Sequence, residues 1–141
     1  MMFKLTRIWL LLGCLMTGCQ DNTPKSISDR YTHAMEIYHG KNAGAAEAEL
    51  TAFLTFLSDK QRKSPAAADY NDLRGIVWLR LYSVYRFTCD EAKATDALSH
   101  ATKLLQGRIV KAQDQQNAEK QLKDLLSGLE GEVTPGWKSS Q

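Results

Sequence analysis

The residues that could bind a metal gather in one short segment, His33-x2-Glu36-x2-His39. In the zinc motif H-E-x-x-H, two histidines one helical turn apart share a face. The spacing here instead distributes the three side chains around a helix. We therefore predict a solvated helix face, with no metal and no other cofactor.

Motifs that mark a catalytic site are not found in this sequence. It contains no G-x-S-x-G, no phosphate-binding loop and no glycine-rich dinucleotide turn. Glu47 and Glu49 are predicted to be exposed helix residues rather than a general acid and base. We expect a protein that is not an enzyme and has no small-molecule substrate. An enzyme would need a catalytic cleft built from residues that no sequence motif identifies.

The first 18 residues have the organisation of a secretory signal peptide. Lys4 and Arg7 are followed by the apolar run 8–16 and by small residues. The run is shorter than the roughly 20 residues that span a bilayer. It also lacks the polar face that a helix at the edge of a core would show.

The residues that end this segment, Met16-Thr17-Gly18-Cys19, resemble the lipobox of bacterial lipoproteins. Met16 departs from the usual Leu, and Leu11-Leu12-Gly13-Cys14 is a competing match with a much shorter apolar run. The resemblance implies that Cys19 is lipidated and becomes the N-terminus. Because Gln20 is not Asp, it also implies an outer-membrane lipoprotein facing the periplasm.

Removal of the signal peptide makes the chain electrically neutral. Lys4 and Arg7 account for two of the 18 basic residues, so 16 basic residues then face 16 acidic ones. A neutral domain offers no electrostatic reason to bind nucleic acid or an anionic membrane. We expect membrane attachment through the lipid alone.

Apolar spacing predicts an all-α fold after a tether over residues 19–27, which reaches about 25 Å when extended. The folded domain is predicted over 28–127, with a disordered tail over 128–141. Short loops indicate antiparallel helix pairs. The five predicted helices run from a Ser28 cap to His39, from near Asn42, from Ser64-Pro65 to about Thr88, from an Asp90 cap to Gly107, and from Ile109 to Leu126.

The third and fourth predicted helices resemble a tetratricopeptide repeat, and the first two give a weaker copy. Tyr82 and Gln106 depart from the small Gly and the terminal Pro of the family. A generic antiparallel bundle is the alternative. The matching positions are Trp78, Leu81, Tyr85, Ala94, Leu98 and Ala101.

In tetratricopeptide proteins the first helix of each pair lines a groove. The resemblance therefore implies a protein-interaction adaptor that binds an envelope protein or peptide. A small inhibitory or immunity-type lipoprotein, which blocks a toxin, phage factor or hydrolase with another surface, is the alternative. The implied groove residues are Thr32, Glu36, His39, Leu79, Ser83 and Arg86.

Two further side chains allow more than one interpretation. Cys89, just before the Asp90 cap, is predicted to be a buried thiol rather than a reactive one or half of an intermolecular disulfide. Trp137 is interpreted as part of a disordered tail, with a short motif that docks on a partner as the alternative.

Overall fold

A computed structural model describes residues 26–64, 69–130 and 136–137 of the chain. The signal peptide over 1–18 and the predicted lipidation site Cys19 lie outside these residues. The described part contains no strand, which confirms the all-α prediction, and no helix in it is long and apolar enough to cross a membrane. Its five helices are α2 (Ile27–Tyr38), α3 (Ala43–Lys63), α4 (Asn71–Phe87), α5 (Glu91–Leu105) and α6 (Gln115–Glu130).

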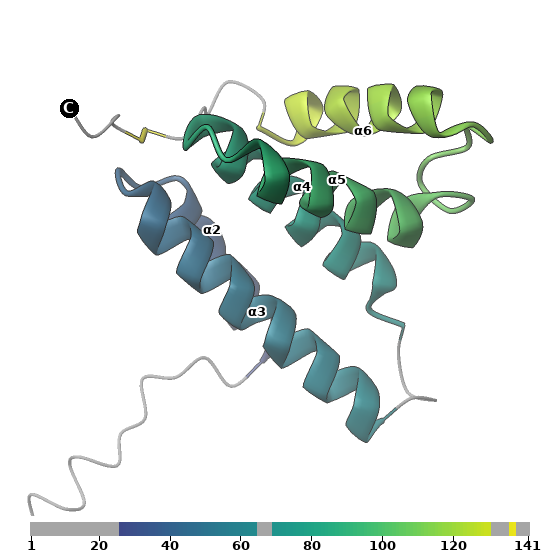
Figure 1. Cartoon of the computed structure of the whole chain (residues 1–141). Coiled ribbons are helices and arrows are strands. Elements are labelled where there is room, and N and C mark those ends of the chain that lie inside the picture. The colour runs from purple at the N-terminus through teal and green to yellow at the C-terminus, as the bar shows by residue number, and fades with distance from the viewer. Residues whose placement is uncertain (1–25, 65–68, 131–135, 138–141) are drawn as a thin grey trace, which may run out of the picture.

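The helices form two antiparallel pairs and a covering helix (Figure 1). α2 packs on α3, and α4 packs on α5, while α3 joins the pairs by packing against α4. α6 lies across α5 and α4 on the side away from α2 and α3. α6 thus covers one side of the α4–α5 pair.

α4 separates two apolar cores. The first lies among α2, α3, α4 and the start of α5, and includes the fully buried Tyr38 and Phe53. The second lies among α4, α5 and α6, around Leu105 and Leu122. Trp78 packs against both clusters. α4 thus buries several of its sides, which is consistent with apolar residues that are spread around the helix.

The start of α2 and the end of α3 differ from the predicted boundaries, each for a local reason. Ser26, not Ser28, caps α2, since the Ser26 Oγ accepts the Asp29 N–H at 3.0 Å. Ser64 ends α3 instead of starting the next helix. A residue before proline avoids the α region, so Ser64-Pro65 works here as a stop signal.

α4 ends in a Schellman motif that places Cys89 in the left-handed region, at φ 59°. The Asp90 N–H donates to the Tyr85 carbonyl at 2.9 Å, and the Cys89 N–H donates to the Arg86 carbonyl at 3.3 Å. Asp90 then caps α5, as predicted, by accepting the Lys93 N–H at 3.1 Å. Cys89 is exposed, so the prediction of a buried thiol is wrong.

The last helix begins and ends later than predicted. Residues 106–114 form a loop that buries Val110, and Asp114 accepts the Asn117 N–H at 2.9 Å at the start of α6. α6 then continues through Gly128 to Glu130, past the predicted end of the domain. Apolar residues alone did not indicate this start because Ile109 and Val110 belong to the loop.

Trp137 packs onto the folded domain rather than extending from it. Its indole N–H donates to the Tyr38 carbonyl at 2.9 Å, and its ring meets those of Tyr38 and Phe87 with centroids 5.1 and 5.3 Å away. The Tyr38 hydroxyl donates to the Glu130 carboxylate, and burial raises the pKa of Tyr38 above its ordinary value. These contacts bring the end of α6 and Trp137 against α2.

Candidate functional site: a groove between α3 and α4

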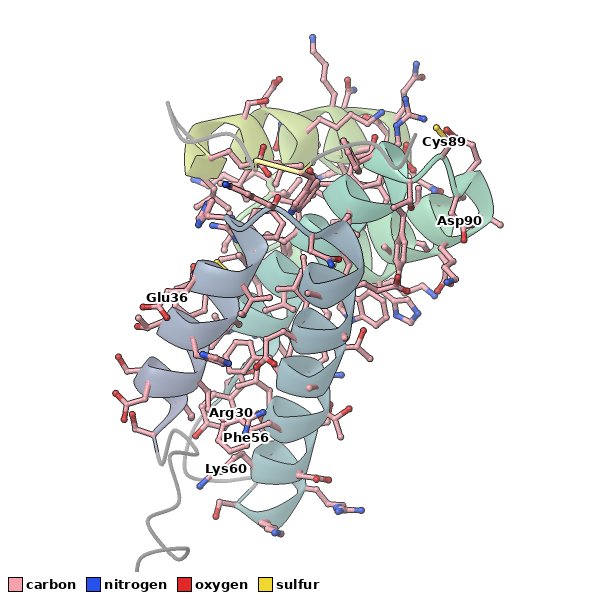
Figure 2. All side chains as sticks on the ribbon, turned by 90° about the vertical axis from the view of Figure 1, so that its left-hand side faces the viewer. Arg30, Glu36, Phe56, Lys60, Cys89 and Asp90 are labelled. Atoms are coloured by element: carbon pink, nitrogen blue, oxygen red, sulfur yellow. The ribbon has the colours of Figure 1, made fainter. Side chains whose placement is uncertain are left out.

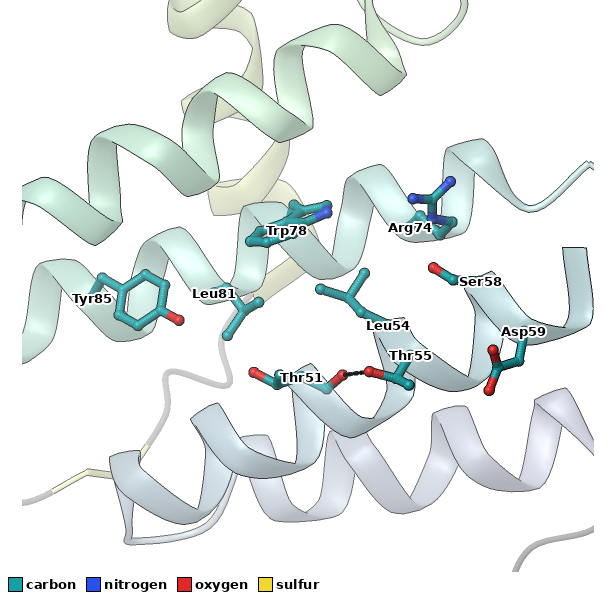
Figure 3. Close-up of a pocket in the computed structure, with 9 residues that line it drawn as sticks. All are labelled: Thr51, Leu54, Thr55, Ser58, Asp59, Arg74, Trp78, Leu81 and Tyr85. Carbon is teal, nitrogen blue, oxygen red and sulfur yellow. Dashed lines mark hydrogen bonds between the residues drawn. The ribbon is translucent and has the colours of Figure 1, made fainter. Parts of the chain in front are cut away.

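A groove of about 360 Å³ runs along the junction of the two helix pairs (Figure 3). Its volume lies within the range of natural ligand sites. The groove is open along its length because only α3 and α4 form its walls. Its lining residues are Thr51, Leu54, Thr55, Ser58, Asp59, Arg74, Trp78, Leu81 and Tyr85.

The α3 wall presents small hydroxyl side chains. Thr51, Thr55 and Ser58 are exposed and follow one another at i, i+4 and i+7, which places them on one face of the helix. The Thr55 hydroxyl donates to the Thr51 carbonyl at 3.2 Å. Short side chains of this kind leave room for another backbone to approach.

The α4 wall is aromatic and apolar. Trp78, Leu81 and Tyr85 lie on one face of α4, with Leu81 buried as part of the floor. His100 of α5 stacks on the Trp78 ring with centroids 4.3 Å apart and 13° between the planes. This stacking supports the indole from within the α4–α5 pair.

Arg74 lies at one end of the groove, and not all of its guanidinium N–H groups have a hydrogen-bond partner. Its Nη1 donates to the Asn71 side-chain oxygen at 3.3 Å, whereas its Nε is buried and unpartnered. Within the described ranges, no carboxylate makes an ion pair with it, since Asp59 is paired with Arg62 at 2.9 Å. A guanidinium in this state can bind an incoming carboxylate.

Tyr85 occupies the other end among charged neighbours. The Lys93 ammonium lies 5.4 Å from the centre of its ring and 3.3 Å from the Glu47 carboxylate. Burial, together with the nearby Glu47 carboxylate, raises the pKa of Tyr85 to about 12. The hydroxyl therefore remains protonated at neutral pH.

The groove residues suit binding better than catalysis. Arg74 can hold an anion, the aromatic wall can hold apolar groups, and the hydroxyls can exchange hydrogen bonds with a ligand. The one carboxylate in the lining, Asp59, is partly exposed and engaged with Arg62. Among the lining residues that the structure describes, Asp59 has no second carboxylate or histidine beside it.

The predicted groove residues of α2 lie on other surfaces. Thr32 and Glu36 are exposed, and Figure 2 shows Glu36 on the outer side of α2, while His39 is half-buried with its ring against Tyr38. His33 points to Glu49 of α3, with Nε2 and Oε1 3.9 Å apart. No group of three potential metal ligands occurs among the residues that the structure describes.

The predicted residues of α4 lie away from this groove as well. Leu79 is fully buried among α5 and α6, so it cannot contact a partner unless α6 moves away, and its placement in an open groove is wrong. Ser83 is half-buried and hydrogen-bonds with Tyr38. Arg86 is exposed but bonded to Glu91 at 2.6 Å. The six predicted residues therefore do not form one surface.

The α3–α4 groove escaped prediction because the repeat resemblance assigned Trp78 and Tyr85 to the packing within a helix pair. One sequence signal did exist. The hydroxyls of Thr51, Thr55 and Ser58 recur at helical spacing beside the apolar face of the same helix. Such a polar but uncharged face indicates a surface that another chain can approach.

Comparison with known proteins does not identify a relative: no protein family, no curated protein and no solved structure matches this chain.

Proposed function

We propose that this protein is a lipid-anchored adaptor of the bacterial envelope, and that it binds a segment of another envelope protein in the α3–α4 groove. The observation that carries the proposal is the combination of an aromatic wall with an unpaired, partly buried Arg74 at its end. The occupant that fits is an apolar helical segment with one acidic residue.

The dimensions of the groove favour a short segment. From Arg74 to Tyr85 the α4 wall extends about 16 Å, at 1.5 Å per helical residue. This length matches about three turns of a partner helix. Apolar side chains would pack on Trp78, the acidic residue would pair with Arg74, and the hydroxyls of α3 would leave space for the partner backbone.

The anchor part of the proposal rests on Met16-Thr17-Gly18-Cys19 and the signal peptide before it. Two or more acyl chains hold a protein stably on a bilayer, because each buried methylene contributes about 0.8 kcal/mol. Replacement of Cys19 by Ser should leave an uncleaved precursor or release the protein from membranes. Normal processing and anchoring of the Cys19→Ser protein would refute the lipoprotein assignment.

Site-specific photocrosslinking in the native host tests the groove. A crosslinker at Thr55 should capture one dominant envelope protein, whereas a crosslinker at the exposed Lys120 of α6 should not. Arg74→Glu should abolish the Thr55 crosslink. The matched control Arg86→Glu, which changes an exposed arginine of the same helix outside the groove, should retain it.

Two other outcomes would redirect the assignment. If Arg74→Glu folds normally by circular dichroism and the Thr55 crosslink persists, the groove is not the binding site. If the dominant crosslinks arise from Thr32 or Glu36 on the outer face of α2 instead, an inhibitor that uses another surface becomes the better assignment.

A further inference from the structure

Two cations from different helices flank one aromatic ring near the start of α2. The Arg30 guanidinium lies 4.8 Å from the centre of the Phe56 ring, and the Lys60 ammonium lies 5.6 Å from it. Figure 2 shows the three side chains together, close to the point where the chain enters α2. The Arg30 Nε is buried without a hydrogen-bond partner, and in the described part of the chain neither cation has an ion pair.

α3 carries further positive charge past the end of α2. α2 has 12 residues and α3 has 21, so the last turns of α3 project beyond the pair, as Figure 1 shows. The projecting end carries Arg62 and Lys63 as well as Lys60. We call Arg30, Phe56, Lys60, Arg62 and Lys63 the basic end of the molecule.

The acidic groups at this end do not cancel its charge. Asp59 is bonded to Arg62, and Asp29 lies in the first turn of α2. Asp69, which precedes α4, is bonded to Arg108 at 2.6 Å. With these pairs formed, Arg30, Lys60 and Lys63 still outnumber Asp29.

The helix dipoles explain only part of this cluster. Basic residues are favourable in the last turn of α3, where the dipole is negative. Arg30 lies near the N-terminal end of α2, where the dipole disfavours a cation. Two helices of opposite direction thus both place cations at the same end, and Arg30 is held there by its contact with the Phe56 ring rather than by the helix dipole.

The basic end is also the end from which the chain runs back to Cys19. Six residues lie between Cys19 and Ser26, the cap of α2, and the seven extended steps from Cys19 to Ser26 reach about 23 Å. α3 alone is about 31 Å long at 1.5 Å per residue. The tether therefore holds the basic end near the bilayer without by itself fixing the orientation of the domain.

We propose that the basic end docks on the anionic phospholipid headgroups of the bilayer that holds the lipid anchor, so that the domain stands with its α4–α5 turn away from the membrane. The inference rests on the proposed lipid anchor. Phosphate oxygens would accept hydrogen bonds from Arg30, Lys60 and Lys63, while Phe56 would lie at the level of the headgroups.

Energy transfer from two positions on the lipidated protein to an acceptor dye on the vesicle surface tests the orientation. One donor is attached to the exposed Cys89, which Figure 2 shows at the end of the molecule opposite Lys60. The other donor is attached through Ser64→Cys, at the exposed end of α3, in a chain that also carries Cys89→Ser. The vesicles contain either phosphatidylcholine alone or phosphatidylcholine with phosphatidylglycerol.

On the phosphatidylglycerol vesicles, transfer from position 64 should exceed transfer from position 89. The difference should disappear on phosphatidylcholine, at about 1 M salt, where the Debye length falls to about 3 Å, and with Lys60→Glu and Lys63→Glu together. Lys120→Glu and Lys123→Glu, which reverse two exposed charges of α6, should leave the difference unchanged.

Flotation with the vesicles separates the two possible failures. A protein that floats but shows equal transfer from both positions on phosphatidylglycerol, or a difference insensitive to salt, refutes the docked orientation and leaves the anchor intact. A protein that does not float at all refutes the lipid anchor and the orientation with it.

Discussion

Replacement of Gly75 by Ala tests how closely α4 and α5 pack. A Cβ atom at this position would lie 2.5 Å from Leu105 Cγ and 2.6 Å from Leu105 Cδ2. Leu105 is fully buried, so it has little room to move. Overpacking of a core costs about 1–3 kcal/mol, whereas Ala gains about 1 kcal/mol over Gly in helix propensity. Gly75→Ala should therefore lower the free energy of unfolding by up to about 2 kcal/mol.

Urea unfolding followed by circular dichroism measures this effect, with Gly128→Ala as the matched control. A Cβ at Gly128 would meet no atom within 4 Å, so the same substitution in α6 should stabilise the protein by about 0.5–1 kcal/mol. If Gly75→Ala stabilises the protein as much as Gly128→Ala does, α4 and α5 do not pack as closely at Gly75 as the structure shows.

The partner residue provides a second test of the same contact. Leu105→Ala alone should cost about 2–5 kcal/mol because it leaves a cavity. The added methyl of Gly75→Ala would fill part of that cavity. The double mutant should therefore be more stable than the sum of the two single effects predicts.

Three further predictions concern the α4–α5 turn, the packing of Trp137 on Tyr38, and the loss of stability at alkaline pH. Cys89→Gly should raise the free energy of unfolding by about 1 kcal/mol in thermal melts, because glycine lacks the left-handed penalty; Cys89→Ala should give no such gain. Trp137→Ala should lower the melting temperature and remove the emission of an indole packed on Tyr38, and an unchanged melt would contradict the packing. The pKa of Tyr85 is raised from an ordinary value of 10.0 to about 12 in the folded state, so this stabilisation is present below pH 10 and is lost as pH rises through about 12. Tyr85→Phe should therefore lose less stability between about pH 9 and about pH 11 than the unchanged protein does, as measured by urea unfolding.

Local signals were enough to predict most of the helices. The spacing of apolar residues placed α3 and α5 correctly, and the Asp90 cap lies where the sequence predicted it. Both features depend on residues within a few positions of each other. The end of α3 at Ser64 was mispredicted because a serine before a proline fits both the end of one helix and the start of the next. The start of α6 at Gln115 was mispredicted because the apolar Ile109 and Val110 belong to the preceding loop.

Only part of the candidate site could be predicted from the sequence. The hydroxyls of α3 are visible as a helical face, but their opposition to Trp78 depends on how the two helix pairs meet. The resemblance to the repeat family placed Leu79 in a groove because the first helix of each pair lines a groove in that family. Since α6 packs against that face of α4, Leu79 is buried and the opposite face is left open.

By itself, the sequence determined the all-α class, the amphipathic faces of the helices and the cap of α5, because each of these depends on neighbours a turn or so away. The tertiary structure decided which face of α4 is covered, the contact of Gly75 with Leu105, the exposure of Cys89 and the return of Trp137 to Tyr38. These features join residues far apart in the chain. Apolar periodicity indicates that a face is buried but does not identify the element that buries it.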